Sequence, residues 1–278
     1  MLALADVGHA GHPQPPHRSG HRLTLGVEDL GLREDVDDHA GHAVTVPGSV
    51  RRPTGKSAPV SATELVHLGH ACLVVDTGTA RALLDPGAFS DGWQTLEGLD
   101  AILVTHQHVD HLDIDRLPAL LERNPDAELV VDPGTADVLR EKGIAHTRRE
   151  PGEEFTVGGT RVEVVGAERG EHAVIHPDIP VIANNGYVLR AEGGTVMHPG
   201  DAYVPAPAGV DVLLLPTGAP WLKVSEAVDY LRAVAPPVAV PIHEAVLANP
   251  DLHYGLFDSL SPTGTDVRVL ARGVTTPA

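Results

Sequence analysis

The sequence predicts a layered α/β domain rather than a purely doubly wound sheet. Strand-like segments come first, in hairpin-like succession, and strand-like and helix-like segments alternate after them. Composition adds a constraint, because 42% of the residues are apolar but only 3% are aromatic. We therefore expect a core built mainly from Val, Leu, Ile and Ala.

The domain is expected to open with three strands in hairpin-like succession. Residues 64–67, 71–76 and 81–85 are apolar stretches, and glycine turns at Gly69 and Gly78 separate them. Consecutive strands joined by such short turns pair most simply as antiparallel neighbours. This part of the chain is therefore predicted to start a sheet.

The rest of the domain alternates strands with helices. Apolar residues at the spacing of a helix face lie within 113–122, which Asp113 can cap, and Gly143 stops the next helical segment. The predicted elements are strands at 101–105, 128–131, 155–157, 161–165, 181–190, 195–198, 210–215, 238–242 and near 267–270, and helices at 113–122, 135–142 and 225–234.

The first sixty residues differ in composition from the rest. They hold no aromatic residue, six prolines and eight glycines, and no helical or strand period persists in them. We expect residues 1–61 to form a disordered extension, because such a composition buries too little apolar surface to offset chain entropy. Their six histidines allow a metal-gathering tail, and translation begun upstream of the natural start is the other interpretation.

Charge and cysteine content exclude several classes of protein. A net charge of −18 repels phosphate backbones, so neither nucleic acid nor an anionic membrane surface is an expected partner. Cys72 is the single cysteine, so no disulfide can form within the chain, and we expect it to be buried. No apolar run reaches the length of a membrane span and no secretory signal is apparent, which predicts a cytoplasmic protein.

The most informative segment follows the apolar run 101–104. It reads Thr105-His106-Gln107-His108-Val109-Asp110-His111 and places three imidazoles and a carboxylate within six residues. Imidazole nitrogen and carboxylate oxygen suit zinc and similar divalent ions. A chance cluster is the alternative, since the chain has 17 histidines, but the position directly behind a strand favours a metal site.

Further candidate ligands follow other predicted strands. Asp201 comes after the strand 195–198, His243 directly after 238–242, and His172 in the segment behind 161–165. Each has an ordinary alternative, a turn aspartate for Asp201 and a core histidine for His243. His176 and His198 are rivals of His172, so the sequence leaves this last ligand open.

The order of these residues resembles the metallo-β-lactamase superfamily. The His-X-His-X-Asp-His block, a later histidine, a Gly-Asp after a strand and a final strand-terminal histidine carry the resemblance, which runs from about residue 63 to 270. It implies a four-layer αββα sandwich with a two-metal site at one edge of the sheets. The segments Leu68-Gly69-His70-Ala71 and Leu84-Asp85-Pro86-Gly87 are similar to the branch that contains ascorbate-6-phosphate lactonase and uncharacterised metal-dependent hydrolases.

The resemblance also implies roles for individual residues. Two divalent ions, with zinc expected and manganese or iron as alternatives, would be held by His106, His108 and His172 and by Asp110, His111 and His243, bridged by Asp201. Asp110 is also the expected catalytic group that orients the attacking hydroxide. Residues expected to support the ligands or meet the substrate are His70, Asp85, His198, Trp221 and Lys223.

We therefore predict a metal-dependent hydrolase that acts on an ester, lactone or related bond of a small molecule. A phosphodiesterase with the same site is the second hypothesis, and the acidic charge argues against long nucleic acids as its substrate. A metal-binding scaffold or sensor without turnover is the third. The sequence leaves the oligomeric state open.

Overall fold

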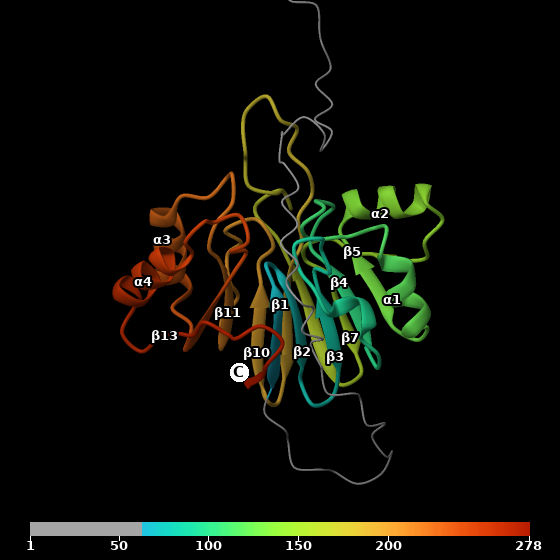
Figure 1. Ribbon diagram of the computed structural model, residues 1–278, viewed down its shortest axis with the longest axis horizontal. Coiled ribbons are helices and arrows are strands. Elements are labelled where there is room, and N and C mark those ends of the chain that lie inside the picture. Colours follow the sequence, from blue (N-terminus) through green and yellow to red (C-terminus); the bar gives the residue numbers. More distant parts are fainter. Residues whose placement is uncertain (1–62) are drawn as a thin grey trace, which may run out of the picture. The chain divides into compact units, whose positions relative to one another are not determined.

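The computed structural model describes residues 63–278. The extension expected at 1–61 lies outside the described residues. Two seven-stranded sheets pack face to face, with one pair of helices outside each of them (Figure 1). This arrangement confirms the predicted four-layer αββα sandwich.

The first sheet is built from the N-terminal half of the domain and one returning strand. Its order is β14-β1-β2-β3-β4-β5-β6. Strands β14, β1, β2 and β3 pair antiparallel, and β3 to β6 pair parallel. The strands are β1 (Glu64–Gly69), β2 (Cys72–Asp76), β3 (Arg81–Leu84), β4 (Ala101–Val104), β5 (Glu128–Val131), β6 (Thr147–Arg148) and β14 (Thr275–Pro277).

The second sheet follows in sequence and has the order β13-β12-β11-β10-β9-β8-β7. Strands β7 to β10 pair antiparallel, and β10 to β13 pair parallel. The strands are β7 (Glu154–Val157), β8 (Thr160–Val165), β9 (Gly186–Ala191), β10 (Gly194–His198), β11 (Val212–Pro216), β12 (Val238–Ile242) and β13 (Asp266–Val267).

Alternation along the strands divides the core into layers. In β4, Leu103 faces the second sheet while Ile102 faces the helices outside the first, because successive side chains of a strand point to opposite faces. Helices α1 (Leu117–Arg123) and α2 (Pro133–Glu141) cover the first sheet, and α3 (Val224–Val234) and α4 (Asp251–Leu260) cover the second. In residues 63–278 every helix falls short of the length and apolar content that a membrane span requires.

Several element boundaries differ from those predicted. The strand expected at 181–190 begins only at Gly186, because the preceding residues form a loop in which Ala183 makes a single bridge to Glu171. The helix expected at 113–122 begins at Leu117, with a proline in its first turn where the absent N–H costs no helical hydrogen bond. Strands β6 and β14, helix α4 and the short 3-10 turn at Trp93–Thr95 were not predicted.

The topology brings several loops to one edge of the sandwich. Strands β1, β3 and β4 run in the same direction, as do β10, β11 and β12, so their carboxyl ends lie at common edges. The sheets are joined there by backbone hydrogen bonds from Asn185 N to Thr105 O and from His243 N to His70 O, both 2.9 Å. The loop at 166–185 projects beyond this edge (Figure 1).

Tyr187 links the two sheets beside this edge, and its substitution measures how much this link stabilises their packing. Its buried hydroxyl donates to Val104 O at 2.9 Å, across the interface between β9 and β4. Replacing Tyr187 by Phe should lower the free energy of unfolding by about 1–2 kcal/mol, because a buried carbonyl loses its partner. Urea unfolding measures this difference.

Tyr203→Phe is the matched control, because the Tyr203 hydroxyl makes only a long 3.4 Å contact with Lys223 O. Its free energy of unfolding should stay within about 0.5 kcal/mol of the parent value. Equal stability of the two variants would show that the inter-sheet hydrogen bond contributes nothing.

Candidate metal centre

Eight side chains with metal-binding atoms meet at this edge. They form three overlapping groups, and within each group the candidate ligand atoms all lie within 4.8 Å of one another. Both sheets contribute, and all seven residues predicted as ligands are present, joined by one further histidine. The eight are His70, His106, His108, Asp110, His111, His172, Asp201 and His243.

A buried carboxylate determines how the chain leaves strand β4. Asp85, in the loop after β3, accepts hydrogen bonds from the backbone N–H of Thr105 and from its hydroxyl, both at 2.8 Å. Its Oδ2 also lies 2.7 Å from Nδ1 of His111. The loop then turns back, because the N–H groups of His111 and Leu112 both donate to His108 O at 2.9 Å. Asp85 therefore contacts the candidate ligand His111 at the nitrogen that faces away from the centre.

The first group is formed by His106, His108 and His172. Nε2 of His106 and Nδ1 of His108 are 3.0 Å apart, and the His172 ring centroid lies 4.9 and 4.8 Å from the other two. Nε2 of His172 is buried without a hydrogen-bond partner. An unpartnered buried nitrogen beside two others is the condition that a bound cation would relieve.

The second group is formed by Asp110, His111 and His243, with His70 beside them. Nε2 of His243 is 3.1 Å from Nε2 of His111 and 3.5 Å from Oδ2 of Asp110. His70 approaches the same carboxylate oxygen, with its Nε2 3.1 Å away. Nε2 of His111, Nε2 of His243 and an oxygen of Asp110 are therefore close enough to share one ion, and Nε2 of His70 lies beside them.

Asp201 lies between the two groups. Its Oδ1 is 3.3 Å from Nε2 of His111, and its Oδ2 is 3.2 Å from Nε2 of His243 and 3.4 Å from Nε2 of His172. The indole N–H of Trp221 donates to Oδ2 at 2.9 Å. Oδ1 is buried without a hydrogen-bond partner. This position allows one carboxylate to serve both groups.

The hydrogen bonds at Nδ1 direct four imidazoles into the centre. Carbonyl and carboxylate oxygens only accept hydrogen bonds, so each Nδ1 bonded to one must carry a hydrogen, and Nε2 is the nitrogen that faces the centre and can bind a metal once it has no proton. The Thr105 hydroxyl donates to Asp85, so its oxygen likewise accepts from His106. The four pairs are His106 with Thr105 Oγ1 at 3.0 Å, His111 with Asp85 Oδ2 at 2.7 Å, His172 with Ala173 O at 2.6 Å and His243 with Gly218 O at 2.5 Å.

His70 and His198 have the opposite arrangement. The backbone N–H of Ala245 donates to Nδ1 of His70 at 3.2 Å, and that of Gly200 donates to Nδ1 of His198 at 3.0 Å. Their hydrogens are therefore on Nε2, where His70 donates to Asp110 and His198 donates to Ala71 O at 3.0 Å. Neither ring directs a lone pair at the centre, so the structure places both residues beside the candidate ligands rather than among them.

The electrostatics of the centre suit a cation. Burial alone would raise the pKa of Asp201, but the imidazoles of His111 and His243 overcome burial and hold that pKa well below its ordinary value. Burial would lower the pKa of His243, but Asp201 and Asp110 raise it to about 9. Two ionised carboxylates are thus held in a buried site that requires positive charge beside them.

Other residues considered from the sequence lie outside the centre. Lys223, expected near the substrate, is 76% exposed, and its ammonium pairs with Glu226 at 2.9 Å rather than with a candidate ligand. His176, the rival of His172, is 60% exposed beside Asp178, which leaves His172 as the histidine of the centre. Cys72 is buried, and burial raises the pKa of its thiol, so it cannot act as a nucleophile.

Two supporting residues were not foreseen. Asn184 is buried, and its side chain accepts from Asp201 N at 2.9 Å and donates to Pro199 O at 3.0 Å. Glu244 accepts from His70 N at 3.1 Å and from Arg272 at 2.7 Å. The pair Asn184-Asn185 just before a strand was the available signal for the first, and Glu244 follows His243 directly in sequence.

Gly87 allows the loop after β3 to pack against the loop that carries the ligands. A Cβ on Gly87 would lie 1.8 Å from Asp110 O and 2.6 Å from His111 N. Gly87→Ala must therefore displace the backbone of two candidate ligands, and it should lower the free energy of unfolding by about 1–3 kcal/mol. Urea unfolding of the metal-free protein checks this.

Gly255→Ala is the control for the same substitution, since nothing lies within 4 Å of a Cβ at this position in helix α4. It should raise stability by about 0.5–1 kcal/mol through helix propensity. A Gly87→Ala variant as stable as the parent would contradict the close packing of these two loops.

Comparison with known proteins identifies the family of the chain. The β-lactamase superfamily domain model matches residues 64–243. Protein Rv0786c of Mycobacterium tuberculosis is 50% identical over 213 residues, which cover 74% of this chain and 96% of that protein. A UPF0173 metal-dependent hydrolase of Aeropyrum pernix is 29% identical over 205 residues, which cover 64% of this chain and 81% of that protein.

A solved structure shares the fold. Igni18, a metallo hydrolase from the archaeon Ignicoccus hospitalis, superposes with a TM-score of 0.60 at 20% identity, covering 78% of this chain and 98% of that one. The family match spans most of the described domain, and the relative with 50% identity is matched over nearly its whole length. The chain therefore belongs to the metallo-β-lactamase superfamily, to which metal-dependent hydrolases belong, as the resemblance in its sequence predicted.

Proposed function

We propose that the chain is a hydrolase with two divalent metal ions, acting on an ester, lactone or related bond of a small molecule. The observation that carries the proposal is the convergence of seven potential ligands into two groups joined by Asp201. The names of its relatives support it, since the Aeropyrum pernix protein is called a metal-dependent hydrolase and Igni18 a metallo hydrolase.

Each group would hold one ion. His106, His108 and His172 would bind the first, and Asp110, His111 and His243 the second, with Asp201 shared between them. The set of five imidazoles and two carboxylates suits zinc best, and manganese and iron accept the same atoms. The unpartnered nitrogen of His172 and oxygen of Asp201 fit this assignment.

Divalent ions bound at such a site supply Lewis acidity, which lowers the pKa of water and polarises the oxygen of the bond under attack. Hydrolysis of an ester adds one water: the acyl carbon–oxygen bond breaks, the carbon gains hydroxyl, and the proton passes to the leaving oxygen. Asp110, whose Oδ2 is oriented by the N–H of His70, would accept a hydrogen bond from the attacking water. Trp221 would hold Asp201 in place through Oδ2.

Metal content tests the assignment. Elemental analysis of the purified protein should find about two ions per chain, and His108→Ala should reduce this to about one, because the first group loses a ligand.

Asp201→Asn should lower hydrolysis by at least about a hundredfold, since losing a ligand costs at least as much as losing a group that orients one. Lys223→Ala, whose side chain is exposed and paired with Glu226, is the control and should match the parent.

The metal-loaded protein is then assayed on ester, lactone, thioester and phosphodiester panels. Hydrolysis confined to phosphodiesters would replace the proposed bond with that of the second hypothesis. Two bound ions with no hydrolysis on any panel would favour a non-catalytic scaffold.

Metal binding should depend on pH in a defined direction. Asp201 and Asp110 raise the pKa of His243 to about 9 in the metal-free protein, so at pH 7 its Nε2 carries a proton that the metal must displace. The apparent affinity should therefore rise between pH 6.5 and about 9, by up to about tenfold per pH unit for each displaced proton.

Isothermal titration of the metal-free protein in two buffers of different ionisation enthalpy measures the protons released. The second group contributes at least one, because the pKa of His111 is also raised by Asp201 and Asp85. Equal affinities at pH 6.5 and 8.5, with no proton release, would contradict a role for His243 as a ligand.

A further inference from the structure

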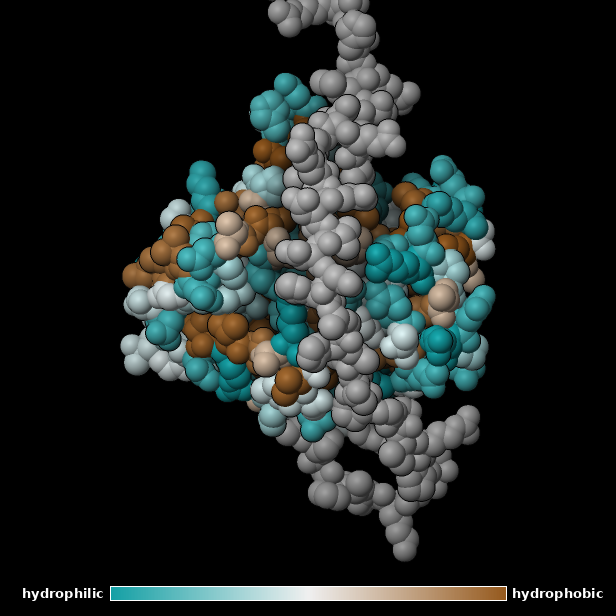
Figure 2. All heavy atoms as spheres, viewed as in Figure 1, coloured by the Kyte–Doolittle hydropathy of each residue, from teal (hydrophilic) through white to brown (hydrophobic). Residues whose placement is uncertain are grey.

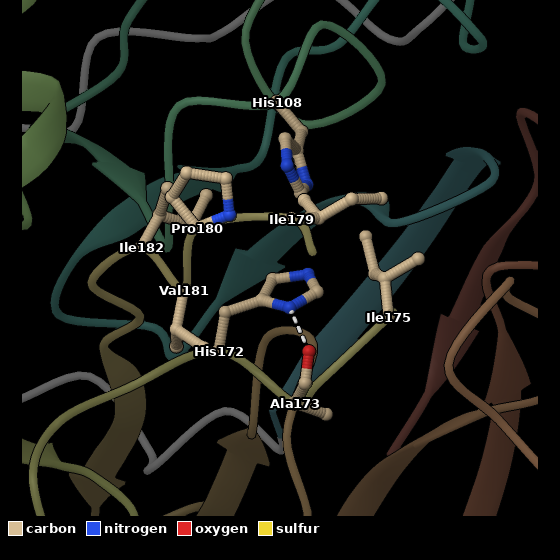
Figure 3. A pocket seen from close by; sticks show the side chains of 8 residues that line it. All are labelled: His108, His172, Ala173, Ile175, Ile179, Pro180, Val181 and Ile182. Carbon is tan, nitrogen blue, oxygen red and sulfur yellow. Dashed lines mark hydrogen bonds between the residues drawn. The ribbon is translucent and has the colours of Figure 1, made fainter. Parts of the chain in front are cut away.

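The first group of candidate ligands faces a pocket with an aliphatic wall. His108 and His172 line it with their imidazoles, aliphatic side chains lie around them, and the rest of the lining carries no charged side chain (Figure 3). The empty space among these residues is about 230 Å³ and includes open solvent, so the pocket is a partly open hollow and not a closed cavity. The remaining lining residues are Ala173, Ile175, Ile179, Pro180, Val181 and Ile182.

This wall belongs to the projecting loop at 166–185 and is anchored at its base. Ala173 N donates to Asp201 O at 2.8 Å, and His172 N donates to Ile182 O at 2.9 Å. Near its tip, Ile179 N donates to His176 O at 2.9 Å. The loop is therefore tied to the same segment that carries Asp201, which places its aliphatic residues at a defined position beside the centre.

Exposed apolar side chains gather around the centre rather than over the whole surface. Of the ten large hydrophobic residues exposed in the described part of the chain, six lie on loops that carry or contact the candidate ligands. Val174, Ile179 and Val181 are 59%, 44% and 44% exposed on the projecting loop, which shows apolar side chains below a hydrophilic tip (Figure 2). The other three are Phe89, Val109 and Val246.

Two of these three lie next to residues beside the second group. Val109 lies between His108 and Asp110 in sequence and is 58% exposed. The Phe89 ring lies 5.3 Å from the ring of His70. An apolar surface of this kind, rimming a polar centre, gains free energy only when an apolar group covers it.

We propose that this pocket binds the acyl or alkyl group of the substrate, so that the protein hydrolyses esters, thioesters or lactones of hydrophobic acids. The inference rests on the proposed function and names its substrate class. A phosphorylated or polyhydroxylated substrate would lose hydration against this wall without gaining a partner, since no lysine or arginine lines it. Because His108 and His172 of the first group line the pocket, the scissile bond of a substrate whose acyl group fills it would lie beside the proposed metal site.

The test uses the metal-loaded protein and p-nitrophenyl esters of acetate, butyrate, hexanoate and octanoate, with the hemisuccinate ester as a charged comparator. kcat/KM should rise about two- to fourfold per methylene up to at least hexanoate, since each buried methylene is removed from water. The hemisuccinate should react more slowly than butyrate. Hydroxamates with the same chains are titrated calorimetrically as a measure of binding that needs no turnover.

Matched variants locate the effect. Ile179→Ser and Val181→Ser should reduce the increase per methylene to below about 1.5-fold, for esters and hydroxamates alike, because each removes an aliphatic part of the wall. Val269→Ser changes a residue that is 53% exposed and lies outside the pocket, and it should keep the slope of the parent. Metal content of each variant is measured to show that the centre is retained.

The outcomes separate the two proposals. Hydrolysis of esters without dependence on chain length, or a preference for the hemisuccinate, overturns the apolar pocket and leaves the proposed function in place. No hydrolysis of these esters, together with none on the lactone and thioester panels, overturns the proposed bond. The hydroxamate titrations still decide the pocket, because equal affinities along the series would exclude it.

Discussion

The centre depends on one buried carboxylate, that of Asp85. It is fully enclosed, and its two oxygens accept from the N–H and hydroxyl of Thr105 and from Nδ1 of His111. A buried carboxylate is tolerated only with such partners, so these hydrogen bonds are obligatory rather than incidental. Through Thr105 the same contacts reach Nδ1 of His106. One residue thus orients an imidazole in each of the two groups.

The two sheets must meet for the centre to exist. The first sheet supplies His106, His108, Asp110 and His111, and the second supplies the remaining three candidate ligands. Hydrogen bonds such as Asn185 N to Thr105 O cross between the sheets beside them. Any ion that binds ligands from both sheets will also stabilise their packing, because it binds the folded chain and not the unfolded one. The apolar loop adds a contrasting surface beside this polar edge.

The periodic parts of the fold were predictable from the sequence. Strands such as Glu128–Val131 and Val238–Ile242 have the bounds expected, because buried strands read as continuous apolar runs. The same pattern misled at 181–185, where Val181 and Ile182 line a pocket instead of a sheet. Helix α4 gave little signal, since Phe257 is its only buried residue. An apolar stretch of sequence indicates that its side chains meet an apolar surface, but it does not indicate whether that surface is a sheet, a helix or the wall of a pocket.

By itself the sequence determined the types of ligand and the close spacing of His106, His108, Asp110 and His111, because these side chains share one loop. Tertiary structure alone decided between His172 and His176, since the choice depends on how the loop at 166–185 returns to Asp201. It also decided which nitrogen of an imidazole such as that of His243 faces the centre, because its partner Gly218 O lies far away in sequence. The order of residues along the sequence specifies which chemical groups are present, whereas hydrogen bonds between distant segments specify which nitrogen of an imidazole is directed at the centre.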